Sequence, residues 1–224
     1  MATIDNQNVK WRNDILLPAT RKTLDFLAQE QWLKKEKWYL AGGTALALQV
    51  GHRRSLDLDF FISQKTFVLN EVTRHFTKSR WKINIAKEGT IYAELGGVKV
   101  SFIAYPLFIP KKPFCLYGNI SILQPIDIAV MKIIAISQRG RKRDFVDLYW
   151  CATQKEPLLE IIKKLPYQYP AVAHNYHHIL KSLVYFTDAD SDPMPKVFFE
   201  TSWKEIKKYF KREVPRIARE LLDF

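Results

Sequence analysis

The stretch from residue 38 to residue 62 constrains the fold of this chain more than any other part of the sequence. It opens with an apolar run, Trp38–Ala41, and passes through Gly42–Thr44 into Ala45–Val50, which is rich in helix-forming residues. After a polar turn, Leu56–Ile62 begins by alternating apolar and acidic residues, as in a strand that presents its acids on one face. We therefore predict a strand, a glycine turn, a short buried helix and a second strand.

The two acids of the second strand, Asp57 and Asp59, indicate a metal–phosphate site. Carboxylates at positions i and i+2 of a strand lie side by side and repel each other, and a divalent cation removes that cost. Mg²⁺ (or Mn²⁺) prefers such oxygen ligands and completes its shell with water and substrate phosphates. Glycines before a helix let a phosphate approach the free N–H groups of the helix end, and Thr44 adds a hydroxyl. The alternative is two solvated aspartates on an edge strand and a simple strand-to-helix turn.

Other elements of the N-terminal half follow from apolar spacing and turn residues. Apolar residues at helical spacing predict a helix over residues 20–34 and a weaker one over 67–78. Glu88-Gly89 and Gly96-Gly97 are turn signals between three apolar segments, which predicts an antiparallel meander. Its strands are Trp81–Ala86, Thr90–Leu95 and Val98–Ala104.

The character of the sequence changes after a proline-containing loop, Tyr105–Pro113, which we take as the domain boundary. One more strand is expected at Ile120–Leu123, and helices follow. The expected helices are Asp127–Gln138, Asp144–Cys151, Ala171–Phe186 and Trp203–Leu222, the last kinked or broken at Pro215. The prediction is an α+β fold with a domain over residues 1–113 and a mainly helical domain over 114–224.

Charge and composition limit the kinds of binding partner and the cellular compartment that we expect. The 224 residues include 35 Lys and Arg against 23 Asp and Glu, a net charge of +12, which favours polyanionic partners over purely solvated basic faces. Two cysteines form no disulfide framework, and the absence of a CxxC motif argues against structural zinc, so we expect a reducing cytoplasm. The N-terminal sequence lacks the apolar core of a signal peptide, and no apolar run approaches ~18 residues, so no membrane span is expected.

Two blocks of the sequence together resemble a known family. The first, Leu40–Phe61, holds G-G-T-A-L, G-H-R-R-S and D-L-D-F-F, and the second, Lys132–Leu148, holds a K-x-x-A-x-x-x-R segment followed by R-D-x-x-D-L. Their order and spacing resemble the AbiEii/AbiGii toxins of abortive-infection and toxin–antitoxin systems, within the DNA-polymerase-β-like nucleotidyltransferase superfamily. The resemblance implies a nucleotidyltransferase-type mixed sheet with flanking helices, followed by a C-terminal helical bundle that completes the cleft.

The resemblance also implies roles for individual residues. Asp57 and Asp59 would hold Mg²⁺ and act in catalysis, and Lys132 and Asp144 would be further catalytic groups. The remaining contacts to a nucleoside triphosphate would come from the glycine turn, the polar turn and the helical part of the chain. The implied nucleotide-binding residues are Gly42, Gly43, Thr44, Arg54, Ser55, Lys132 and Arg139.

One position departs from the superfamily pattern. A third carboxylate is expected on a later strand facing the two aspartates, and its counterpart in this chain is Ser101. A serine cannot act as a carboxylate base. Either Glu94 or Asp144 supplies the charge, or the site is weakened for transfer while nucleotide binding is less affected.

Four other features have both functional and structural interpretations. The basic turn Arg139–Arg143 could grip a triphosphate or RNA, or be a solvated loop. Asp144 could equally act as a helix-terminal acid that suits the helix dipole. His174 and His178 have a metal-compatible spacing if they share a helix, although no zinc-protease motif surrounds them. The basic face of 203–222 could contact RNA or be solvated.

These observations predict an Mg²⁺-dependent nucleotidyltransferase that transfers NMP from an NTP to a hydroxyl, with RNA and its tRNA 3′ end as the expected acceptor. The resemblance adds a toxin or phage-defence role and a cognate antitoxin protein. Two alternatives stay open: a degenerate module that binds NTP or RNA without catalysis, which Ser101 favours, and an enzyme that modifies a small molecule.

Overall fold

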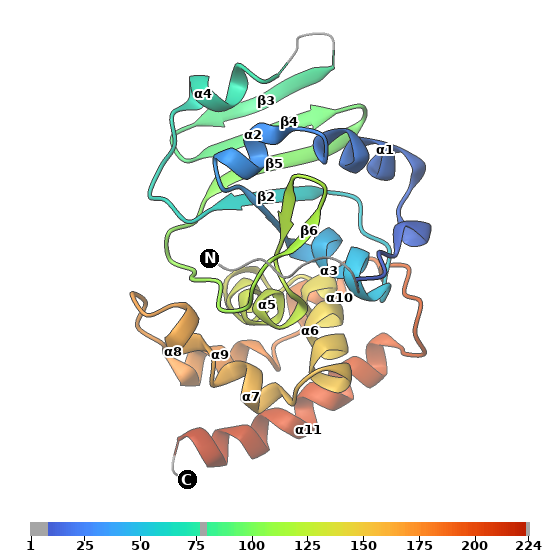
Figure 1. Cartoon of the computed structure of the whole chain (residues 1–224). Coiled ribbons are helices and arrows are strands. Elements are labelled where there is room, and N and C mark those ends of the chain that lie inside the picture. Colours follow the sequence, from blue (N-terminus) through green and yellow to red (C-terminus); the bar gives the residue numbers. More distant parts are fainter. Residues whose placement is uncertain (1–8, 77–79, 223–224) are drawn as a thin grey trace. The chain divides into compact units, whose positions relative to one another are not determined.

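The computed structural model describes residues 9–76 and 80–222 of the chain. Two compact units emerge, Met1–Gln124 and Pro125–Phe224, which we describe separately (Figure 1). The division lies later than the boundary expected after Pro113, because two short strands within residues 114–124 belong to the sheet of the first unit.

A seven-stranded mixed sheet forms the first unit, in the order β3-β4-β5-β2-β1-β7-β6. Two neighbouring pairs, β2 with β5 and β1 with β7, are parallel, and the other four pairs are antiparallel. The strands are β1 (Tyr39–Ala41), β2 (Leu58–Ile62), β3 (Trp81–Lys87), β4 (Thr90–Leu95), β5 (Val98–Ala104), β6 (Cys115–Tyr117) and β7 (Ile120–Ile122).

The predicted meander and the α+β class are confirmed. The turns at Gly89 and Gly96-Gly97 have positive φ angles, which glycine adopts without strain, and they join β3, β4 and β5 into an antiparallel ribbon. Strand β6 (Cys115–Tyr117) was missed because it lies just after the proline-containing loop, where the sequence predicts the domain boundary. Strand β2 begins at Leu58 rather than at Leu56, so Asp57 lies immediately before the strand and Asp59 within it.

The helices of the first unit are η2 (Asn13–Ile15), α1 (Pro18–Leu27), α2 (Gln31–Lys35), α3 (Gly42–Val50) and α4 (Leu69–Thr73). The single helix predicted over 20–34 is wrong, because α1 ends at Leu27 and α2 starts at Gln31. Leu24 and Leu33 are both fully buried, yet nine residues of one continuous helix would place them on opposite sides. The break lets both side chains enter the core. The predicted helix 67–78 shortens to α4, and residues 77 and 78 lie outside the described residues.

Aromatic packing fills the core on one face of the sheet. Phe60 of β2 stacks on Phe102 of β5 with 5.3 Å between ring centroids, and Trp38 meets Phe102 edge-on at 5.2 Å. All three side chains are completely buried. Because side chains alternate along a strand, burying Phe60 and Phe102 directs their neighbours Asp59 and Ser101 to the opposite face.

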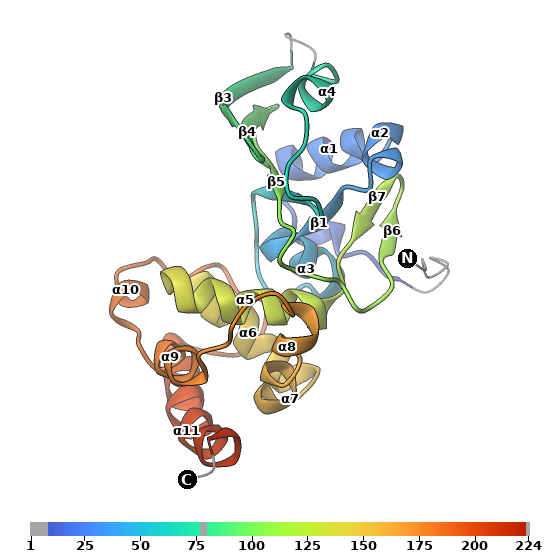
Figure 2. The same cartoon turned by 90° about the vertical axis from the view of Figure 1, so that its left-hand side faces the viewer.

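The second unit is helical, as predicted, and α5 and α6 lie side by side in it (Figure 2). Helix α11 packs against α6 and α9. The helices are α5 (Pro125–Arg139), α6 (Lys142–Gln154), α7 (Leu158–Ile162), α8 (Leu165–Gln168), α9 (Tyr176–Ser182), α10 (Thr187–Asp190) and α11 (Trp203–Leu221).

Two helix predictions in this unit need correction. The helix expected over 171–186 is restricted to α9, which begins after Asn175 because that side chain accepts the N–H of His178 and caps the helix. Helix α11 continues through Pro215, so the expected break is wrong, while the expected kink stays a prediction; this proline is exposed, so water can bond the carbonyl that its missing N–H leaves open. Among the described residues, no helix combines the length and the apolar character needed to cross a membrane.

Candidate functional site

The first turn of α3 lies directly against side chains of the polar turn (Arg53 and Ser55) and of the aspartate motif (Asp59). Gly42 has φ +71°, and a Cβ at this position would lie 3.0 Å from Oδ2 of Asp59. A Cβ on Gly43 would lie 2.2 Å from Nη2 of Arg53 and 3.0 Å from Oγ of Ser55. The two glycines therefore let a carboxylate and a guanidinium approach the helix end. The N-cap residue is Ala41, whose side chain has no acceptor for the N–H groups of the first turn.

Thr44 connects α3 to the polar turn and to the aspartate motif. Its hydroxyl donates to the backbone carbonyl of Asp57 and lies 2.9 Å from the Ser55 hydroxyl. The Thr44 side chain is buried, so its hydrogen bonds position Asp57 and Ser55 from inside the protein. This leaves the backbone N–H groups of the helix end as the donors that α3 can offer to an anion.

Asp59 and Ser101 form the centre of the site. They are direct partners in the parallel pairing of β2 with β5, and the Ser101 hydroxyl donates to Oδ1 of Asp59 over 2.7 Å. Asp59 is half-buried and Ser101 is buried. The serine that replaces the expected third carboxylate thus fixes one oxygen of the aspartate, while Oδ2 lies toward Gly42.

The arginines of the polar turn differ from each other in their surroundings. Arg53 is buried, and its Nη1 donates to the backbone carbonyl of Arg54 over 2.9 Å, which fixes its guanidinium over Gly43. Sequence reasoning did not assign Arg53 to the site, although it follows the histidine of the G-H-R-R-S segment. Nε of Arg54 is shielded from solvent and has no hydrogen-bond partner among the residues that the structure describes. An anion beside Arg54 would satisfy that donor.

The carboxylates of this site could supply some of the ligands of a metal ion, and substrate phosphates would have to supply the others. Within residues 9–76 and 80–222, no group of three or more His, Cys, Asp or Glu side chains is arranged to hold a metal ion. Two aspartates together with substrate phosphates match the coordination preference of Mg²⁺, which usually binds to only one or two protein carboxylates. His174 and His178 do not share a helix, since α9 starts at Tyr176, and their Nε2 atoms lie 3.2 Å and 3.1 Å from the backbone carbonyls of Tyr169 and Ser137.

Of the two candidates for the missing carboxylate, Glu94 shares a sheet face with Asp59. It is the partner of Lys99 on β5, which stands two residues before Ser101 on the same face. Asp144 belongs instead to α6 of the second unit. That Glu94 acts as the base remains a prediction.

The predicted catalytic residues of the second unit form a buried ion network between α5 and α6. Nζ of Lys132 lies 2.6 Å from Oδ1 of Asp144 and 2.7 Å from Oδ2 of Asp147, and Nε of Arg139 lies 3.2 Å from Oδ2 of Asp144. Both aspartates are completely buried. Burial alone would raise the pKa of Asp144, but the charges of Lys132 and Arg139 outweigh it and hold the pKa below its usual range.

The ion network accounts for part of the sequence pattern in Lys132–Leu148. Lys132 was expected to contact phosphates, whereas its ammonium group is already bonded to two carboxylates within its own unit. Sequence reasoning missed Asp147 as a partner, although its spacing of three residues from Asp144 places both on one face of α6. The roles of Lys132, Asp144 and Arg139 toward a nucleotide remain predictions.

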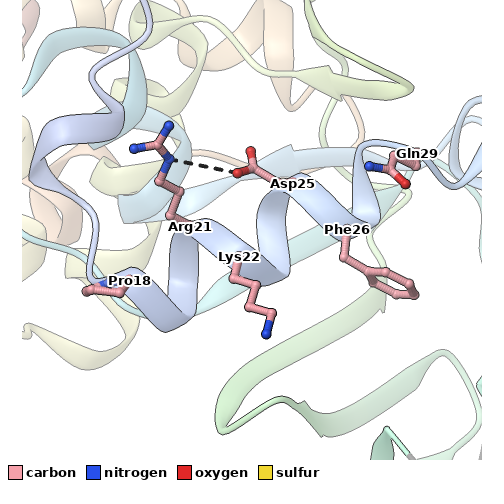
Figure 3. Close-up of a pocket in the computed structure, with 6 residues that line it drawn as sticks. All are labelled: Pro18, Arg21, Lys22, Asp25, Phe26 and Gln29. Carbon is pink, nitrogen blue, oxygen red and sulfur yellow. Dashed lines mark ion pairs between the residues drawn. The ribbon is translucent and has the colours of Figure 1, made fainter.

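A separate pocket lies along α1 in the first unit (Figure 3). Its lining includes an ion pair between Arg21 and Asp25, with 3.8 Å between Nε and Oδ2. All of its lining residues belong to α1 or the two residues after it, and none is a predicted site residue. The lining residues are Pro18, Arg21, Lys22, Asp25, Phe26 and Gln29.

The sequence and the fold of the chain are similar to those of known proteins. The chain is 40% identical over 184 residues to an uncharacterized protein of Aquifex aeolicus, a match that covers 79% of this chain and 86% of the other. A similar fold occurs in MenT4, a nucleotidyltransferase toxin of Mycobacterium tuberculosis H37Rv (13% identity, TM-score 0.56, 90% of this chain and 86% of that one). It also occurs in a candidate nucleotidyltransferase from H. pylori (17% identity, TM-score 0.53, 92% and 96%).

The family match covers most of the chain. Residues 25–223 match the model of the nucleotidyl transferase AbiEii toxins, described as a Type IV toxin–antitoxin system. Both blocks quoted from the sequence lie within this range. The chain therefore belongs to the AbiEii family of nucleotidyltransferase toxins.

Proposed function

We propose that this protein is an Mg²⁺-dependent nucleotidyltransferase that transfers NMP from an NTP to a hydroxyl of RNA, with a tRNA 3′ end as the expected acceptor. In this proposal it acts in the cytoplasm as the toxin of a system that also encodes an antitoxin protein, and it serves in phage defence. The family supports the reaction class and the toxin–antitoxin context. The metal, the acceptor and the biological setting are parts of the proposal.

The observation that carries the proposal is the contact between α3 and Asp59. Oδ2 of Asp59 lies 3.0 Å from the point where a Cβ on Gly42 would stand, so the carboxylate meets the first turn of the helix. Free N–H groups at a helix end bind phosphate, and an aspartate binds Mg²⁺. Both kinds of ligand for an Mg²⁺-bound triphosphate are therefore adjacent within one unit.

The chain's own residues would orient the triphosphate for attack on its α-phosphate. The N–H groups at the start of α3 would bind phosphate oxygens, and the Arg54 guanidinium would donate its otherwise unused Nε. Ser101 holds the Asp59 carboxylate in one orientation, and Thr44 holds the backbone at Asp57. Mg²⁺, when bound by Asp57 and Asp59, would neutralise the charge that develops on the phosphates.

The proposal keeps Lys132, Arg139 and Asp144 as groups of the second unit that act on the nucleotide. Among them, Arg139 is the most accessible to a ligand from solvent, because about half of its side chain (53%) is exposed. Lys132 would have to weaken two buried ion pairs before it could contact a phosphate. We therefore expect Arg139 to bind the nucleotide. Lys132 and Asp144 would position the Arg139 side chain for this contact.

An RNA acceptor suits the charge of the chain. Most of the excess positive charge lies in residues 1–124, the unit that carries Asp57 and Asp59. A basic surface increases the affinity for a phosphate backbone and the rate of association with it. The second candidate function, binding of NTP or RNA without transfer, is favoured by Ser101 in place of a carboxylate.

The experiment is to incubate the full chain with Mg²⁺, one α-³²P-labelled NTP at a time and total bacterial RNA, followed by a denaturing gel. We expect label in a band of tRNA size with a preferred NTP, and no label with Asp57→Asn/Asp59→Asn protein that retains the wild-type circular dichroism spectrum. Equal labelling by the double variant would refute the assignment. Absence of label for the wild type, with NTP binding intact, would favour the non-catalytic alternative.

A further inference from the structure

We propose that the sheet face beside Asp59 binds the single-stranded end of the acceptor RNA, with Tyr92 as the residue that stacks on a base. This inference rests on the proposed function, because it assigns the place where the acceptor reaches the nucleotide site. The surface consists of Tyr92, Ile85, Lys82, Lys87 and Lys99, and we call it the β3–β5 surface.

The strand register connects Tyr92 to the candidate catalytic centre. Asp59 is the direct partner of Ser101, Ser101 is the partner of Tyr92, and Tyr92 is the partner of Ile85. Directly paired residues on neighbouring strands present their side chains on the same face. These four residues therefore form one row across β2, β5, β4 and β3. With strands spaced ~4.8 Å apart, Tyr92 stands roughly 10 Å from Asp59 along this row.

The end of this row is apolar and open to solvent. Tyr92 is 42% exposed and Ile85 is 48% exposed, whereas the residues that flank Tyr92 along β4, Ile91 and Ala93, are buried. An irregularity in the pairing between Ile83 and Ile85 brings Ile85 onto the face of Tyr92. An exposed aromatic ring beside an aliphatic side chain offers a flat surface for a nucleobase.

Lysines surround the aromatic residue on the same face. Lys82 and Lys99 are both partners of Glu94, which stands two residues from Tyr92, and Lys87 is the partner of Thr90, two residues away in the other direction. All three lysines are exposed, and within the described part of the chain none of them has an ion-pair partner. Their ammonium groups are therefore available to a polyanion.

An aromatic platform between cationic groups is the combination that binds single-stranded nucleic acid. Base stacking on an aromatic side chain contributes ~1–3 kcal/mol, and lysines follow the phosphate backbone. A second copy of the chain is a poorer occupant of this face, because two such faces would bring the same lysines, Lys82, Lys87 and Lys99, together with like charges. The separation of roughly 10 Å is short enough for the last nucleotides of an RNA strand to span.

The first test compares Tyr92→Ala and Tyr92→Phe with Tyr167→Ala, which removes an exposed tyrosine of the second unit (69% exposed). In the labelled-NTP assay, we expect Tyr92→Ala to raise the KM for tRNA about tenfold, within the range for one lost stack. The affinity for NTP should stay unchanged, and Tyr92→Phe and Tyr167→Ala should behave like the wild type. A KM for tRNA within twofold of the wild type in Tyr92→Ala would overturn the inference.

The second test measures RNA binding without transfer, so that failure of the proposed reaction is distinguishable from failure of this inference. The probe is a fluorescent single-stranded oligoribonucleotide of twelve nucleotides, followed by anisotropy with the full-length protein. We expect Lys82→Gln/Lys87→Gln to weaken binding and to lower its salt dependence, since two phosphate contacts are lost. The matched control is Lys204→Gln/Lys208→Gln on α11, two exposed lysines, for which we expect a smaller loss.

Two results of the binding test would overturn the inference. The first is an equal loss of affinity in both lysine pairs, which would mean that charge alone attracts the RNA. The second is tighter binding of a fully double-stranded RNA than of the single strand, because a duplex cannot stack its bases on Tyr92. A wild type that binds the oligoribonucleotide more tightly than both Tyr92→Ala and Lys82→Gln/Lys87→Gln, but transfers no label, would refute the proposed reaction and leave this surface in place.

Discussion

The two pairs of aspartates in this molecule have similar sequence spacing and opposite surroundings. In the first unit, Asp59 is half-buried and accepts a hydrogen bond from the neutral hydroxyl of Ser101. In the second, Asp144 is completely buried and is bonded to the charged groups of Lys132 and Arg139. Asp59 is therefore partly open to solvent, whereas Asp144 is enclosed together with the cations that it contacts.

The difference lies in exposure: a half-buried carboxylate can be reached by a cation from solvent, whereas the buried carboxylates already contact a lysine of their own unit. A carboxylate near solvent beside an open helix end can bind Mg²⁺ and phosphate, as we propose for this site. A carboxylate that is already neutralised in a core would have to lose its lysine first. The following predictions test this division, in order of decreasing effect.

The largest expected effect on stability comes from Lys132→Met. Removing the ammonium group leaves Asp144 and Asp147 buried near each other without their shared cation. We expect the free energy of unfolding to fall by about 3–5 kcal/mol, measured by urea denaturation. Lys208→Met, on the exposed side of α11, is the control and should change it by less than about 0.5 kcal/mol. A stable Lys132→Met variant that lacks only transfer would instead make Lys132 a catalytic residue.

Gly43→Ala should have a smaller effect, confined to the first unit. The new Cβ would lie 2.2 Å from Nη2 of the buried Arg53, so the guanidinium must move. We expect a loss of about 1–3 kcal/mol in unfolding free energy and weaker NTP binding. In an Arg53→Ala background, the same glycine substitution should cost under about 0.5 kcal/mol. Equal costs in the two backgrounds would show that Arg53 is not the obstacle.

Ser101→Ala tests whether the serine orients Asp59 or marks an inactive site. The variant loses the hydrogen bond to Oδ1 of Asp59, which contributes about 1.5 kcal/mol to holding this charged group. We expect the transfer rate to fall about tenfold, with little change in stability. An unchanged rate would exclude an orienting role for Ser101.

Local sequence signals determine part of this architecture, and contacts between distant residues determine the rest. The meander and α3 were predictable because glycine turns and apolar alternation are local signals. The family resemblance places Ser101 on a strand that faces the aspartates, but the hydrogen bond from Ser101 to Asp59 was not predictable, since it depends on the register of two strands whose bonded residues are 42 positions apart. The pairing of Lys132 with Asp147 was missed because the charge pattern alone does not distinguish a lysine that faces a core partner from one that faces a ligand.

The smallest effect at neutral pH concerns acid stability. Because neighbouring cations hold the pKa of Asp144 below its ordinary value, the folded protein keeps this group ionised at a pH where the unfolded chain protonates it. Its contribution to stability is therefore complete above about pH 4 and is lost as the pH falls through the lowered pKa. Urea denaturation from pH 7 to pH 3 should show this loss only at the acid end. Asp144→Asn should flatten that limb, and a wild-type loss between pH 7 and pH 5 would contradict the assignment.

The central claim is that nucleotide and metal bind together where α3 meets Asp59. Calorimetric titration of a non-hydrolysable NTP with Mg²⁺ into the wild type and into Asp59→Asn tests it most directly. The account predicts at least about 100-fold weaker binding in the variant, or roughly 2.7 kcal/mol, with an unchanged melting temperature. Equal affinity of the two proteins for the Mg²⁺-bound nucleotide would contradict it.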